Sequence, residues 1–143
     1  METRSVCEIF LKGSEEQITN FLKQNNLTTE EICLLIVGGV KMKYLDMILP
    51  EKSNEIFFEH AAMSNKLDVL KFLLKKFPDA DLQNAIGNLF YYAFVKFKNW
   101  EMTCFLESLG FPLTRHLSPN FITMDGNRNF ENYKTYLKLN FLF

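Results

Sequence analysis

Residues 59–74 read EHAAMSNKLDVLKFLL, and this stretch decides the fold. Its apolar residues recur at intervals of three and four, which is typical of helices that bury one face. Ser64 and Asn65 interrupt the pattern in the middle, where small polar residues favour a turn. The stretch therefore predicts two short helices that pack against each other around a tight turn.

The same pattern recurs along the chain. Two further blocks begin at residues 7 and 34, before the reference block, and two more begin at residues 92 and 122. One apolar column holds Val6, Cys33, Phe58, Tyr91 and Phe121. Because a lone hairpin cannot bury its apolar face, the stack is the folding unit. We expect an all-α domain over residues 1–143, a stack of about five helical hairpins with repeats at about 5–27, 28–52, 53–81, 82–113 and 117–139.

Helix-capping signals agree with this division. Ser14 with Gln17, and Thr28 with Glu31, have the spacing of a capping box, in which hydroxyl and later side chain satisfy backbone N–H groups reciprocally. Ser118-Pro119 combines an N-cap residue with a proline suited to the first turn. No period-two strand pattern is convincing, so the expected class is all-α.

Composition and charge exclude several classes of protein. The chain has 143 residues, is 48% hydrophobic and has a net charge of −1, so neither disorder nor strong attraction to nucleic acid or anionic lipid is expected. Three cysteines are too few for a disulfide framework and favour a reducing compartment. No apolar run is long enough for a membrane span, and the N-terminus lacks a secretory signal pattern. A cytoplasmic protein is expected, in its own cell or in a host cell.

Residues that carry chemistry do not form a recognisable motif. His60 and His116 are the only histidines, and no CxxC or HxxxH spacing relates them to the cysteines. Gly38-Gly39 lacks the lysine-serine ending of a phosphate loop, and Cys33 is expected to be a small core residue. We therefore expect no catalytic residue, cofactor or metal site. An enzyme, or enzyme subunit, with an unrecognised site remains an alternative.

The reference block resembles an ankyrin repeat. The pair Ala61-Ala62, the turn at Ser64-Asn65 and LDVLKFLL at 67–74 match that family's helix–turn–helix core, and the step from residue 59 to residue 92 equals its period. No block has the usual Thr-Pro-Leu-His start. The shorter steps between the first three blocks leave little room for the β-hairpin finger between repeats. The resemblance implies an ankyrin-like solenoid with reduced or missing fingers.

The resemblance also implies a binding surface, because the first helices of such stacks line a concave face. Carried onto this sequence, the solvent-facing positions of that face are Glu8, Leu11, Lys12, Leu35, Phe57, His60, Met63, Ser64, Phe90, Lys96 and Phe97. Exposed aromatic, leucine and methionine side chains among them favour protein contacts. The alternative is that these apolar residues pack against adjacent helices.

The expected function is non-catalytic binding of another protein through this face. Frequent Lys, Asn and Phe indicate an AT-rich genome. Together with the divergent repeats, this suggests a pathogen effector or viral accessory protein that acts on host machinery. The alternatives are the enzyme named above and a structural unit that oligomerises.

Two further expectations concern the second half of the chain. Trp100 replaces Leu67 of the reference block and should be largely buried between the third and fourth hairpins. The apolar end, residues 139–143, should cap the last hairpin, which favours a monomer. The alternative is a homodimer that pairs through this tail.

Overall fold

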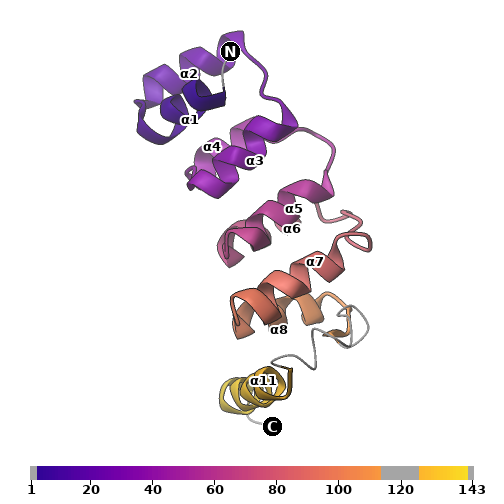
Figure 1. The fold of residues 1–143 in the computed structure, drawn as a ribbon. Coiled ribbons are helices and arrows are strands. Elements are labelled where there is room, and N and C mark those ends of the chain that lie inside the picture. Colours follow the sequence, from indigo (N-terminus) through magenta and orange to yellow (C-terminus); the bar gives the residue numbers. More distant parts are fainter. Residues whose placement is uncertain (1–2, 114–125, 142–143) are drawn as a thin grey trace. The chain divides into compact units, whose positions relative to one another are not determined.

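The computed structural model describes residues 3–113 and 126–141. Within these ranges the chain forms nine α-helices and one π-helical segment, and no strand is present there (Figure 1). The expected all-α class is therefore confirmed. The chain divides into two compact units, Met1–Ala80 and Asp81–Phe143, each of which is described by itself. That both belong to one domain stays a prediction.

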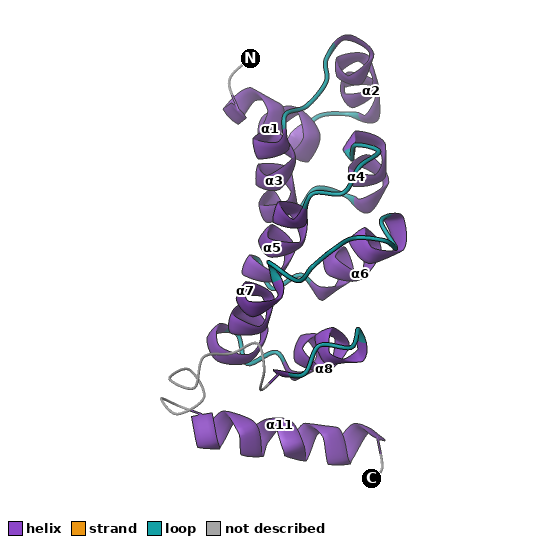
Figure 2. Ribbon diagram, turned by 90° about the vertical axis from the view of Figure 1, so that its right-hand side faces the viewer, coloured by secondary structure: helices purple, strands orange, loops and turns teal. Residues whose placement is uncertain are grey.

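The first unit consists of three helical hairpins. Their helices are α1 (Thr3–Lys12), α2 (Glu15–Gln24), α3 (Thr29–Gly38), α4 (Met42–Ile48), α5 (Glu55–Met63) and α6 (Leu67–Lys76). The first helices form one layer, because α3 packs against both α1 and α5. The second helices α2, α4 and α6 lie along one side of that layer (Figure 2).

Side-chain caps determine where α2 and α3 begin. The hydroxyls of Ser14 and Thr28 each accept a hydrogen bond from the backbone N–H three residues further on. In return, the side chains of Gln17 and Glu31 accept one from the N–H of the capping residue, at 2.8 Å in both cases. Both predicted capping boxes are confirmed. The signal at Ser118-Pro119 lies outside the described residues.

The turns of the second and third hairpins differ in length by one residue. Gly39 has a φ of +90° and Asn65 a φ of +56°, a left-handed conformation that glycine and asparagine adopt most readily. Helix α6 begins two residues after Asn65, whereas α4 begins three residues after Gly39. The second hairpin therefore has an extra residue, Val40, in its turn. The block alignment had matched Val40 to Asn65, which was wrong by one residue.

Because of this extra residue, the first helices repeat at a uniform step. Val6, Ile32 and Phe58 occupy equivalent positions of α1, α3 and α5 at equal intervals along the chain, and all three are buried. The second helices α2, α4 and α6, in contrast, repeat along the chain at the unequal intervals of the block alignment. The predicted column that joined Val6 to Cys33 was therefore out of register, although Cys33 is a buried core residue as expected.

Lysine side chains connect consecutive hairpins. The Lys66 ammonium donates to the carbonyl oxygens of Ile36 and Val37, at 2.9 and 3.3 Å, at the C-terminal end of α3. Lys76 Nζ lies 2.8 Å from Asp46 Oδ1. A cation at a helix C-terminus also complements the helix dipole. Polar contacts therefore reinforce the hairpin register that the core sets.

The described part of the second unit contains one hairpin and a longer helix. Its elements are α7 (Ile86–Phe90), the π-helical segment η1 (Tyr91–Lys96), α8 (Trp100–Ser108) and α11 (Gly126–Phe141). The hairpin turn passes through Lys98, whose φ is +49°. Asn99 then caps α8, because its side-chain oxygen accepts the Met102 N–H at 3.0 Å.

Aromatic side chains attach α11 to this hairpin. The Phe94 ring lies 5.1 Å from the Phe130 ring and 6.2 Å from the Tyr133 ring, centre to centre. The Tyr133 hydroxyl donates to Glu107 Oε1 at 2.6 Å. Trp100 contacts Phe94 and Tyr133 but is only half-buried. These two rings cover part of its indole, and the expected burial of Trp100 between the third and fourth hairpins stays a prediction.

The expected fifth repeat, 117–139, is only partly described. Residues 117–125 lie outside the described residues, and α11 runs without interruption through the rest of the repeat. Leu139 is 75% exposed, so this residue does not cap the core. The side chains of residues 141–143 lie outside the described part, and the predicted tail cap and monomer stay predictions.

Candidate functional site

The predicted binding residues of the first unit lie on one face of its first helices. Three rows cross α1, α3 and α5 at the uniform step, namely Glu8–Leu34–His60, Leu11–Val37–Met63 and Lys12–Gly38–Ser64. Along each helix the member of the first row lies three and four positions before the members of the other two rows, which places all three rows on one face. The predicted site residues that belong to these rows are Glu8, Leu11, Lys12, His60, Met63 and Ser64.

Exposed apolar side chains are concentrated in these rows. The exposed fractions are 40% for Leu11, 44% for both Leu34 and Val37, and 39% for Met63. Leu11 leans toward α3, because a Cβ placed on Gly38 would lie 2.9 Å from Leu11 Cδ1. We call Leu11, Leu34, Val37 and Met63 the first-helix strip.

Leu35 was predicted to be exposed and is fully buried. The prediction placed Leu35 by the interval between the second and third blocks of the alignment. Because the second hairpin has an extra turn residue, this interval is one residue too short for the first helices. At the correct step Leu35 corresponds to the buried Ala61, and Leu34 corresponds to His60. Leu34 and Val37 were therefore missed. An alignment of the first helices on the second glycine of the Gly38-Gly39 pair would have found them.

Phe57 and Phe90 were also predicted to be exposed and are fully buried. Helix α5 packs against both α3 and α6, and its small residues Ala61 and Ala62 let neighbouring helices approach closely, so the Phe57 ring is covered. Phe90 directly precedes the π-helical segment, whose wider turn changes the angle between successive side chains. The predicted exposure of Phe90 assumed an uninterrupted α-helical period.

His60 lies one turn before Met63 on α5, and Ser64 directly follows Met63 as the C-cap of that helix. His60 Nδ1 is 2.9 Å from the carbonyl oxygen of Ile56, which holds the imidazole against its own helix. Ser64 Oγ is buried and has no hydrogen-bond partner among the described residues. Both residues are half-buried, whereas Met63 between them in the sequence is exposed.

Lys96 and Phe97 lie at the end of η1 in the second unit. The Lys96 ammonium is 6.0 Å from the centre of the Tyr92 ring and 5.9 Å from that of Phe97. These distances are at the outer limit of a cation–π contact. Lys96 is exposed, as predicted, whereas Phe97 is half-buried beneath it.

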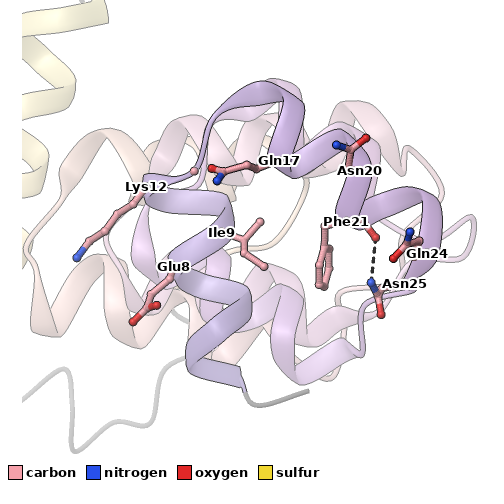
Figure 3. A pocket seen from close by; sticks show the side chains of 9 residues that line it. Glu8, Ile9, Lys12, Gln17, Asn20, Phe21, Gln24 and Asn25 are labelled. Atoms are coloured by element: carbon pink, nitrogen blue, oxygen red, sulfur yellow. Dashed lines mark hydrogen bonds between the residues drawn. The ribbon is translucent and has the colours of Figure 1, made fainter.

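A groove of about 890 Å³ lies between α1 and α2. Its lining consists of Glu8, Ile9, Lys12, Gly13, Gln17, Asn20, Phe21, Gln24 and Asn25 (Figure 3). Gln17 corresponds to Tyr44 in the second hairpin and to Val69 in the third, and both of these residues are buried. Terminal repeats need such a polar outer face. The groove is therefore explained as the solvated end of the first unit.

Two of the cysteine thiols are held in the protonated form by their surroundings. Burial, reinforced by Glu30 and Glu59, raises the pKa of the Cys33 thiol to about 11, and burial also raises the pKa of Cys104. Such thiols stay protonated near neutral pH and react slowly. Among the described residues, no three His, Cys, Asp or Glu side chains gather in a way that could hold a metal ion. His116 lies outside the described part.

No family model, curated protein or solved structure matches this chain. Within residues 3–113 and 126–141, no helix is long and apolar enough to cross a membrane. A function must therefore be argued from the geometry of the site.

Proposed function

We propose that this chain is a non-catalytic module that binds another protein through the first-helix strip. The observation that carries the proposal is the recurrence of an exposed apolar side chain at the same position of three consecutive hairpins, in Leu11, Val37 and Met63. The charged side chains of Glu8 and Lys12 are exposed beside Leu11. An apolar surface with a polar rim is typical of interaction sites.

We also propose that the chain is a divergent ankyrin-like solenoid of about five hairpins. The support is the layered packing of three hairpins at a uniform step in the first unit and a further hairpin in the second. The segments that join the first three hairpins, residues 25–28 and 49–54, contain no strand. In repeat proteins a binding surface is built from one or two side chains of each repeat.

We place the interaction in a reducing compartment, the cytosol of the protein's own cell or of a host cell. Cys7, Cys33 and Cys104 are all free thiols. Free cysteines that are partly exposed, such as Cys7 and Cys104, are typical of proteins in reducing compartments.

Site-specific cross-linking tests the proposed function. A photoreactive amino acid replaces Val37 in the full chain, expressed in its native cells. We expect a discrete covalent adduct with a second protein, because Val37 is the central member of the strip. The matched control carries the same group at Met47, which is 55% exposed on α4, away from the first-helix layer. Adducts of equal yield at both positions, or at Met47 alone, would contradict the proposal.

A charge substitution complements this experiment. With the photoreactive group at Leu34, the double variant Val37→Glu and Met63→Glu should lower the adduct yield at least tenfold, since a partner would have to desolvate both carboxylates. The helical circular-dichroism spectrum should be unchanged, because both positions are exposed in the free chain. Met47→Glu is the control and should leave the yield unchanged.

A further inference from the structure

We infer that α11 is a detachable cover on the hairpin of the second unit, fastened by the hydrogen bond between Tyr133 and Glu107. When α11 detaches, the rings of Phe94 and Trp100 lose part of their cover while the hairpin stays folded. This inference concerns the second unit alone and does not depend on the proposed function. Three observations carry it: the kind of packing that holds α11, the polar groups that its contact buries, and the place of the hydrogen bond.

Side chains, rather than closely packed backbones, hold α11 in place. Within the hairpin, α7 and α8 both pack directly against η1, whereas α11 has no comparably extensive backbone contact with any described helix. The Phe130 ring lies against Phe94, and the Tyr133 ring lies against Phe94 and Trp100, with ring centres 5.1 to 6.2 Å apart. Because α7, η1 and α8 pack on one another without α11, this helix can open as a unit of its own.

The contact of α11 buries polar groups. Asn129 is 1% exposed, and its Oδ1 has no hydrogen-bond partner among the described residues. Glu107, which is half-buried on α8, brings a carboxylate to the same contact. Water hydrates both groups when α11 detaches, which offsets part of the free energy of opening. Contacts between parts that separate reversibly are typically more polar than permanent cores.

The Tyr133–Glu107 hydrogen bond is the strongest polar link between α11 and the hairpin among the described residues. The Tyr133 hydroxyl donates to Glu107 Oε1 at 2.6 Å, and the Leu113 N–H donates to Oε2 at 3.4 Å. Burial and the bond to Glu107 raise the pKa of Tyr133, so the phenol keeps the proton that it donates. A hydrogen bond to a charged acceptor is about twice as strong as one between neutral groups. One carboxylate therefore determines how firmly α11 is held.

Hydrogen exchange of the full chain tests this inference. We expect the amides of residues 130–137, in the middle of α11, to exchange at least tenfold faster than the best-protected amides of η1 and α8, after correction for intrinsic rates. Tyr133→Phe keeps the ring and removes the hydrogen bond, so exchange in residues 130–137 should rise a further tenfold. Exchange in α7, η1 and α8 should change less than twofold.

The matched control is Tyr92→Phe, which makes the same change on a half-buried tyrosine of η1. The Tyr92 ring lies 5.4 Å from the Tyr91 ring, centre to centre, and 6.0 Å from the Lys96 ammonium. Exchange in α11 should be unchanged in this variant.

A double-mutant cycle tests whether Tyr133 and Glu107 act together. Glu107→Ala should accelerate exchange in residues 130–137 about as much as Tyr133→Phe does. The double variant should accelerate it by much less than the product of the two single effects, because both substitutions break the same hydrogen bond.

Three outcomes would overturn the inference. These are equal protection of α11 and the hairpin in the natural chain, acceleration of α7, η1 and α8 to the same extent as α11 by either single variant, and single effects that multiply in the double variant. The first two would show that α11 is an integral part of the hairpin's core. The third would show that another contact fastens it.

Discussion

Gly38 and Gly39 are adjacent but have different roles in the second hairpin. Gly39 adopts the left-handed conformation that ends α3, and its N–H donates to the Ile36 carbonyl oxygen. Gly38 is the last residue of the helix, and its missing side chain leaves room for Leu11. Sequence alone does not distinguish these roles, and the register of the candidate site depends on them.

Alanine substitutions should separate the two glycines. We expect Gly39→Ala to lower the free energy of unfolding by about 1–2 kcal/mol, because an L-residue is strained at positive φ. Gly38→Ala should leave it unchanged or raise it by up to about 1 kcal/mol, since alanine favours the helix and the flexible end of Leu11 can move. Urea denaturation measures both. Equal losses for the two variants would show that the turn has been assigned to the wrong glycine.

Cys33 should make stability depend on pH in alkaline solution. Its pKa is raised in the folded chain to about 11 from an ordinary value of 9.0, so the unfolded chain loses the thiol proton first. The contribution is fully present below pH 9 and is lost as the pH rises towards 11, on the order of 2 kcal/mol. We expect the difference in unfolding free energy between the natural chain and Cys33→Ala to shrink by this amount between pH 8 and 11. A difference that is constant with pH would contradict the prediction.

At the scale of elements, Lys66 joins the turn of the third hairpin to the C-terminus of α3. Its ammonium donates to the carbonyl oxygens of Ile36 and Val37, which lie in the last turn, where a helix offers no N–H four positions further on. An amphipathic pattern cannot reveal this contact, because the donor and acceptors lie on different hairpins, far apart in the sequence.

Removal of this contact should weaken the first unit. We expect Lys66→Met to lower the free energy of unfolding by about 1–2 kcal/mol, through loss of charge-assisted hydrogen bonds at a helix C-terminus. Lys52→Met, at an exposed position in the segment between α4 and α5, is the control and should change it by less than about 0.5 kcal/mol. Thermal and urea denaturation check both variants. A Lys66→Met chain as stable as the control would show that the contact contributes nothing.

At the scale of the whole molecule, each of the two compact units contains a fully buried aromatic ring. Phe58 is fully buried in α5 of the first unit, and Phe94 is fully buried in η1 of the second. Each aromatic ring is among the largest buried side chains of its unit, so each reports on the cooperativity of that unit.

Truncation of these rings tests this division by hydrogen exchange. Phe58→Ala should lower the stability of the first unit by about 3–5 kcal/mol and accelerate amide exchange throughout α1 to α6. Phe94→Ala should accelerate exchange in α7, η1, α8 and α11. If Phe58→Ala accelerated exchange in α5 alone, the three hairpins would not form one cooperative unit.

The sequence by itself determined the helical class, the first four hairpins and the capped beginnings of α2 and α3. These are local properties: an apolar residue every three or four positions requires one buried helix face, and a capping box lies within a single helical turn. The resemblance to a repeat family, rather than this local reasoning, predicted that Leu11 and Met63 are exposed on the first helices, as the structure has them.

Only the tertiary structure decided which further side chains reach solvent. A shift of one residue turns a helix face by about 100°, so the extra residue Val40 exchanges Leu34 for Leu35 at the surface. The burial of Phe57 depends on how closely neighbouring helices approach α5, and that of Phe90 on a π-helical segment that has no sequence signal we recognise. The spacing of apolar residues shows that a helix has a buried face. The packing of neighbouring helices determines which residues that buried face includes.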